Sequence, residues 1–135
     1  MEERRRDLRL AAAALGLSLA GAAGACIPPL QGTLLESRRF VLSFKPEPVA
    51  VAKHFKVEIA VCSKSGPLPD SVRVDAVMPE HRHGMNYRTT VKPVEAGRYL
   101  AEGFMFHMPG RWEFIFEVRS GGNIVERATR SVVLE

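Results

Sequence analysis

The sequence predicts an all-β domain, an immunoglobulin-like antiparallel β-sandwich of about seven strands. Three observations lead to this fold class. Apolar and polar residues alternate with a period of two over several short segments. Turn-forming residues, chiefly Gly and Pro, recur at short intervals between those segments. No helical pattern of useful length is present after residue 30. A small β-barrel is the alternative architecture.

The first three predicted strands span residues 40–44, 55–62 and 72–78. The second of them alternates apolar residues with charged ones, which gives it one face for the core. This alternation places Cys62 on the outer face of the strand. In the third strand, Met78 continues the inward-facing set and is therefore expected in the core.

Four more strands complete the predicted sandwich. They span residues 87–91, 98–106, 112–118 and 124–134, and the 112–118 segment is the most aromatic. The turns between them contain Gly or Pro, as short connections between antiparallel strands commonly do. The predicted domain therefore needs no helix.

Residues 1–25 have the features of a targeting segment. They combine a basic start, an Ala-, Leu- and Gly-rich run, and small residues directly before Cys26, as at a signal-peptidase site. We expect a signal peptide at 1–25 or, as the alternative, an uncleaved membrane-anchor helix. A leader segment that lies over the domain then spans 26–39, and the sandwich spans 40–135. The expected location is periplasmic or otherwise extracytoplasmic, with or without a membrane anchor.

The chain contains two cysteines, Cys26 and Cys62. In an oxidising compartment, a disulfide between them is the simplest pairing. It would close a loop of about 36 residues and stabilise the fold by roughly 3–4 kcal/mol. The alternative is that Cys26 is the lipidated first residue of a bacterial lipoprotein. Lipidation would tether the chain to a membrane and leave Cys62 unpaired.

Residues 78–108 hold three of the four histidines and four of the five methionines of the chain. Imidazole nitrogen and thioether sulfur together suit copper, above all Cu(I), and suit magnesium or calcium poorly. Within this segment, His81, His83 and Met85 follow a proline that ends the preceding strand. In an extended chain these alternate positions project to one side. The pattern therefore predicts three candidate copper ligands on one face.

A second group of candidate ligands lies at the end of the 98–106 strand. Met105 and His107 have the opposite parity to Phe104 and Phe106, which are the stronger core candidates. Met108 is expected to pack inward, although, like Met78, it stays open as a ligand. If both groups lie at one end of the sandwich, they converge on one ion. The predicted copper ligands are His81, His83, Met85, Met105 and His107. The remaining histidine, His54, is interpreted as a surface residue.

Two motifs carry a family resemblance. The segments MPEHRHGM, from Met78 to Met85, and FHMPGRW, from Phe106 to Trp112, resemble the YtkA-like and FixH-like group of small exported or membrane-anchored bacterial domains. The resemblance extends over roughly residues 40–120. It implies an immunoglobulin-like sandwich of the kind found in periplasmic copper-resistance proteins, and a link to copper supply or cytochrome oxidase maturation.

The sequence favours binding over catalysis. A zinc hydrolase of the metallo-β-lactamase type would need a carboxylate where Met85 stands, and catalytic zinc rarely takes thioether ligands. The chain has no Gly-x-Ser-x-Gly motif and no phosphate-binding Gly loop. After residue 25 it carries 15 basic and 12 acidic residues without a basic run interleaved with aromatics, which argues against nucleic acid.

The function predicted from these residues is an exported copper-binding module. It binds Cu(I), or Cu(II) through histidines alone, and passes the ion to or from a partner protein. The alternative is an exported, non-catalytic interaction or scaffold domain without metal.

Overall fold

The structure, a computed structural model, describes residues 25–135. It confirms the all-β prediction, since the described residues form nine strands and no helix. The strands are β1 (Thr33–Glu36), β2 (Phe40–Pro46), β3 (His54–Ser63), β4 (Ser71–Met78), β5 (His83–Gly84), β6 (Thr90–Glu95), β7 (Arg98–Met105), β8 (Gly110–Ser120) and β9 (Asn123–Leu134). No helix within 25–135 could cross a membrane. The predicted N-terminal signal or anchor helix falls outside the described residues.

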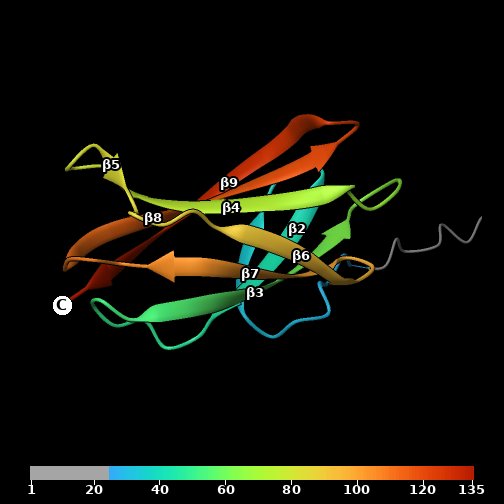
Figure 1. The fold of residues 1–135 in the computed structure, drawn as a ribbon. Helices are drawn as coiled ribbons and strands as arrows, with labels where there is room; N and C mark the ends of the chain where they lie inside the picture. Colours follow the sequence, from blue (N-terminus) through green and yellow to red (C-terminus); the bar gives the residue numbers. More distant parts are fainter. Residues whose placement is uncertain (1–24) are drawn as a thin grey trace, which may run out of the picture.

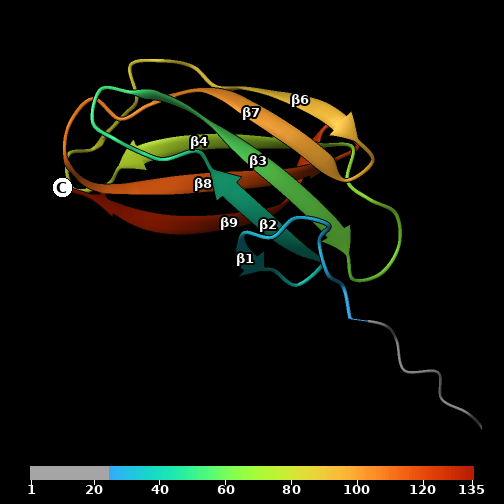
Figure 2. The same ribbon diagram turned by 90° about the horizontal axis from the view of Figure 1, so that it is seen from below.

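Two antiparallel sheets pack face to face (Figure 1). One has the strand order β1-β2-β3-β7-β6 and the other the order β5-β4-β8-β9. Seen from below in Figure 2, β3 and β7 of the first sheet lie over β4 and β8 of the second. The sandwich prediction is therefore confirmed.

The core fills the space between the sheets with the inward-facing side chains of alternating strands. Its largest fully buried side chains are aromatic: Trp112, Phe104, Phe106, Phe114 and Phe116. The ring of Phe106 stacks on the Trp112 indole with centroids 4.4 Å apart and the planes 3° from parallel. Met78 belongs to this core, as predicted, with 1% of its surface exposed. The aromatic cluster gives the start of β8 and the end of β7 a rigid base.

The leader lies over the first sheet and adds a strand to it. Ser43 is buried on the outer face of β2, where its hydroxyl donates to the carbonyl oxygen of Leu30 at 2.8 Å. The predicted Cys26–Cys62 disulfide is present, with Cα atoms 5.8 Å apart. Residues 33–36 of the leader, however, pair with β2 as the edge strand β1. A short strand of this kind gives little period-two signal, which explains why the sequence did not reveal it.

The first residue predicted for the 87–91 strand is wrong. Residues 85–89 cross from one sheet to the other, because β5 pairs with β4 while β6 pairs with β7. Strand β6 therefore begins only at Thr90. The two-residue β5 is the other strand that the sequence did not predict.

The two segments rich in His and Met lie at the same end of the sandwich. Strands β4 and β7 end there, β8 begins there, and β5 and the C-terminus lie beside them (Figures 1 and 2). We call this the C-terminal end of the sandwich. The leader begins at the opposite end, where β3 ends (Figures 1 and 2). The disulfide joins Cys26 of the leader to Cys62, near that end of β3.

Candidate metal site

Three histidines from both sheets form a row at the C-terminal end of the sandwich. The ring centroids of His81 and His83 are 5.7 Å apart, and those of His83 and His107 are 5.2 Å apart. His81 and His83 belong to the turn and strand after β4, whereas His107 follows β7. We call these three residues the histidine row. It brings His107 beside imidazoles that precede it by 24 or more positions in the sequence.

The main chain around His107 is fixed on both sides. The amide of Ala52, in the β2–β3 loop, donates to the carbonyl oxygen of Phe106 at 2.8 Å. The indole Nε1 of Trp112 donates to the carbonyl oxygen of Met108 at 3.0 Å. Because Phe106 and Trp112 also stack in the core, His107 sits on a rigid support.

Strand β5 positions His83. It pairs with the end of β4, where His83 stands opposite Met78. The His83 Nδ1 atom lies 3.0 Å from the carbonyl oxygen of Gly84. Because a carbonyl oxygen only accepts, this contact requires the proton on Nδ1. It therefore leaves the Nε2 lone pair of His83 free to bind a ligand.

A tight turn between β4 and β5 carries His81. The His81 amide donates to the carbonyl oxygen of Met78 at 3.2 Å, and the Arg82 amide donates to that of Pro79 at 3.3 Å. Arg82 adopts a φ of +55°, which non-glycine residues rarely do. His81 itself is exposed, so it is the member of the row that solvent or another molecule can reach first.

The Nδ1 atom of His107 is buried and has no hydrogen-bond partner among the described residues. A buried nitrogen without a partner costs about 1–3 kcal/mol, so native structures contain few of them. Its lone pair or its proton is therefore available for an interaction that the described residues do not supply. Of the three imidazoles, this one shows the clearest unmet bonding capacity.

Trp112 is part of this region, although the sequence did not identify it as such. The His107 ring meets the indole edge-on, with centroids 5.4 Å apart. The His83 ring lies 6.1 Å from it at an interplanar angle of 67°. The fully buried indole thus forms an apolar floor beneath two imidazoles. The contact with His83 depends on the pairing of β4 with β8, which sequence spacing does not show, whereas His107 and Trp112 are five positions apart across the turn between β7 and β8.

The methionines of the two segments occupy different surroundings. Met85 and Met108 are half-buried and pack against the core. Met105, predicted on the same side as His107, is half-buried and stands opposite His54 in the pairing of β3 with β7. His54 is exposed, as predicted. Its ring also contacts the ring of Tyr87, with centroids 5.0 Å apart, which the sequence did not indicate.

One ion pair borders the histidine row. The Arg111 Nε atom lies 3.1 Å from a carboxylate oxygen of Glu80, which precedes His81. Within residues 25–135, no group of three or more His, Cys, Asp or Glu side chains is arranged closely enough to hold a metal ion. Binding by the row would therefore require rotation of an imidazole or a methionine ligand.

The comparisons with known proteins give one match. A family model described as YtkA-like matches residues 35–129, which cover β2 to β8 completely and most of β9. No curated protein and no solved structure matches the chain.

Proposed function

The chain belongs to the YtkA-like family, and we propose that it is an exported copper-binding module in which the histidine row supplies the imidazole ligands. Met85 follows β5 directly and supplies a thioether when the ion is Cu(I). The domain acts as a carrier that exchanges copper with a partner protein and not as a catalyst. The disulfide consumes both thiols of the chain, so no thiolate competes with these ligands.

The observation that carries this proposal is the unsatisfied Nδ1 of His107, together with the spacing of the row. An imidazole bound through one nitrogen at about 2.0 Å holds its ring centre about 3.2 Å from the ion, so two imidazoles at a tetrahedral angle have centres about 5.2 Å apart. The His83 and His107 rings are 5.2 Å apart. These two imidazoles thus have a separation that suits one shared ion.

The hydrogen bond of His83 adds support. Histidines that bind metals usually donate their other ring nitrogen to a carbonyl or carboxylate, which fixes the tautomer. The Nδ1 contact of His83 with the Gly84 carbonyl oxygen is of this kind. Copper would then bind His83 through Nε2 and His107 through Nδ1. A scaffold domain without metal gives no reason for the unsatisfied nitrogen of His107.

The test is a titration of the purified protein with Cu(I) under nitrogen and with Cu(II) in air, in competition with a chromogenic chelator. Loss of even an indirect partner of a metal ligand typically lowers affinity 10- to 100-fold. We therefore expect at least a tenfold loss in the His83→Ala/His107→Ala double variant, and a loss in His81→Ala/His83→Ala.

Arg82→Gln is the matched control, because Arg82 lies between two histidines of the row and offers no neutral ligand atom. It should bind copper like the wild type. Thermal unfolding of each variant shows whether the fold persists. Equal copper uptake by the wild type and the folded double variant would contradict the proposal and favour a scaffold role.

A further inference from the structure

Three side chains meet on the outer face of the five-stranded sheet, beside the histidine row. His54 is the first residue of β3 and Met105 is the last residue of β7. They are direct partners across these two strands, which brings their Cβ atoms to about 4.5–5.5 Å. The Tyr87 ring meets the His54 ring edge-on at 71°. We call His54 and Met105 the outer pair.

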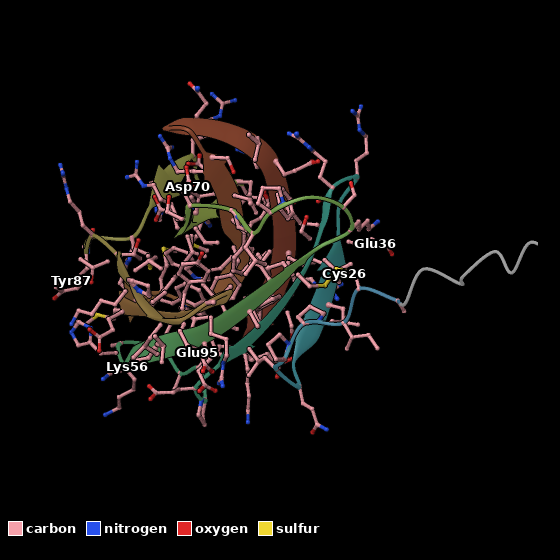
Figure 3. The ribbon with its side chains drawn as sticks, turned by 90° about the vertical axis from the view of Figure 1, so that its right-hand side faces the viewer. Cys26, Glu36, Lys56, Asp70, Tyr87 and Glu95 are labelled. Carbon is pink, nitrogen blue, oxygen red and sulfur yellow. A yellow bond between two sulfur atoms is a disulfide. The ribbon has the colours of Figure 1, made fainter. Side chains whose placement is uncertain are left out.

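The segment that carries Tyr87 is held by contacts with β7 and with β4. Gly103 has a φ of +93°, and its Cα faces the backbone of Arg88 so closely that a Cβ atom there would overlap the Arg88 carbonyl. The hydroxyl of Thr89 donates to the carbonyl oxygen of Val74. The position of Tyr87 beside His54 is therefore fixed by main-chain packing. Figure 3 shows Tyr87 at the periphery of the molecule, far from Cys26.

The outer pair lies close to the histidine row along the chain. Met105 and His107 are two positions apart, and Tyr87, whose ring contacts His54, follows His83. Four residue steps separate His83 from Tyr87. A chain covers at most about 3.6 Å per residue, so the Cα atoms of these two residues are at most about 14 Å apart. Met85 lies between them. A soft ligand thus stands on the short path from one group to the other.

We propose that His54 and Met105 form a second, weaker contact for Cu(I), from which the ion exchanges with the histidine row. This inference rests on the proposed function of the row. One imidazole and one thioether are a soft donor pair that suits Cu(I). His54 is exposed and Met105 half-buried, so an incoming ion can reach both. The Tyr87 ring covers one side of the imidazole and limits its orientations.

The charge near the outer pair is positive and partly compensated. On the outer face of β3, the next residue is Lys56, and its ammonium group is paired with Glu102 at 2.8 Å. Glu102 also pairs with Lys92 at 3.3 Å. The ion pairs compensate part of the positive charge beside the outer pair. Cu(I), with a single positive charge, is therefore less repelled than a divalent ion would be.

The test follows the methionine methyl groups by NMR while Cu(I) is added under nitrogen to the protein labelled at the methionine methyl carbon. We expect the Met105 signal to shift during the second equivalent. In His54→Ala, that shift should disappear and the second binding step should weaken at least tenfold, while the first equivalent binds as in the wild type. Met105→Leu should also abolish the second step, and Tyr87→Phe, which keeps the ring, should retain it.

The outcomes separate the two proposals. If the first equivalent depends on His83 and His107 but the Met105 signal never moves, the outer pair is refuted and the row stands. If the Met105 signal shifts with the first equivalent in His54→Ala as in the wild type, Met105 belongs to the row and the separate contact is refuted. If the first equivalent binds equally well without His83 and His107, the proposed function itself fails, whatever Met105 does.

Discussion

The close approach of the crossing segment to β7 makes Gly103→Ala the sharpest test of the architecture. Gly103 has a φ of +93°, and an added Cβ would overlap the carbonyl group of Arg88. Holding an L-residue in a left-handed conformation costs roughly 1–2 kcal/mol. Overlap with backbone atoms adds roughly 1–3 kcal/mol, because the neighbouring segment has to move. We expect the free energy of unfolding to fall by about 2–5 kcal/mol.

The matched control is Gly66→Ala. Gly66 has a φ of +79°, but apart from its chain neighbours no described atom lies within 4 Å of the position that a Cβ would take. This control therefore isolates the conformational cost, roughly 1–2 kcal/mol. Both variants should be unfolded in urea with the disulfide intact, with the midpoint and slope compared. At about 4–8 °C per kcal/mol, Gly103→Ala should also lower the Tm by at least about 8 °C.

Equal losses in the two variants would refute the reasoning, because they would show that the segment 85–89 does not press on β7. If Gly103→Ala does cost more, the same displacement should separate Tyr87 from His54. The nuclear Overhauser contacts between these two rings should then weaken in Gly103→Ala and persist in Gly66→Ala. This second measurement connects the packing at Gly103 to the outer pair.

Three further predictions concern stability. In the Cys26→Ser/Cys62→Ser variant, the free energy of unfolding should fall by about 3–4 kcal/mol, because the bridge spans 36 residues. An unchanged urea midpoint would contradict this. Arg82→Gly should raise the free energy of unfolding by up to about 1 kcal/mol, since Arg82 holds a φ of +55°. A lower Tm in thermal unfolding would contradict this prediction. The hydrogen-bonded Lys56 ammonium lowers the pKa of the Glu102 carboxyl. The ion pair of Lys56 with Glu102 therefore stabilises the fold at neutral pH, and this contribution is lost as the pH falls through the lowered pKa. Glu102→Gln should make the free energy of unfolding depend less on pH in this acid range. An NMR titration of Glu102 at its ordinary pKa would refute it.

Local patterns were sufficient to predict most of the fold. The alternation in β4 and in the 98–106 segment predicted which side chains face the core, and Met78, Phe104 and Phe106 are buried accordingly. The disulfide followed from the expectation of an oxidising compartment and from the count of cysteines. These predictions succeed because they need no knowledge of strand register. The period-two pattern is read from neighbouring residues, and with two cysteines only one intramolecular pairing is possible.

The contacts that shape the candidate site could not be predicted from the sequence, because they depend on the register between strands that are distant in the chain. The partnership of His54 with Met105 follows from the bulged pairing of β3 with β7. The hydrogen bond from Ala52 to Phe106 joins two loops that lie 54 positions apart. A shift of one residue in either strand would turn these side chains to the opposite face. Sequence spacing alone therefore could not predict that Met105 stands opposite His54.

The three histidines of the row differ in how firmly they are held, and this difference bears on exchange. His107 is supported by the Ala52 and Trp112 hydrogen bonds, and His83 by strand pairing and its own Nδ1 contact. His81 lies on an exposed turn that depends on the strained Arg82. If the row binds copper as proposed, two fixed imidazoles set the geometry, and a partner can displace the third without disturbing the core. Removing His81 should then alter the rate of copper release more than the affinity, whereas removing His107 should alter the affinity first. Stopped-flow transfer to a chelator, compared with equilibrium titration for the single variants His81→Ala and His107→Ala, measures both quantities, and equal effects of the two changes would contradict this division of roles.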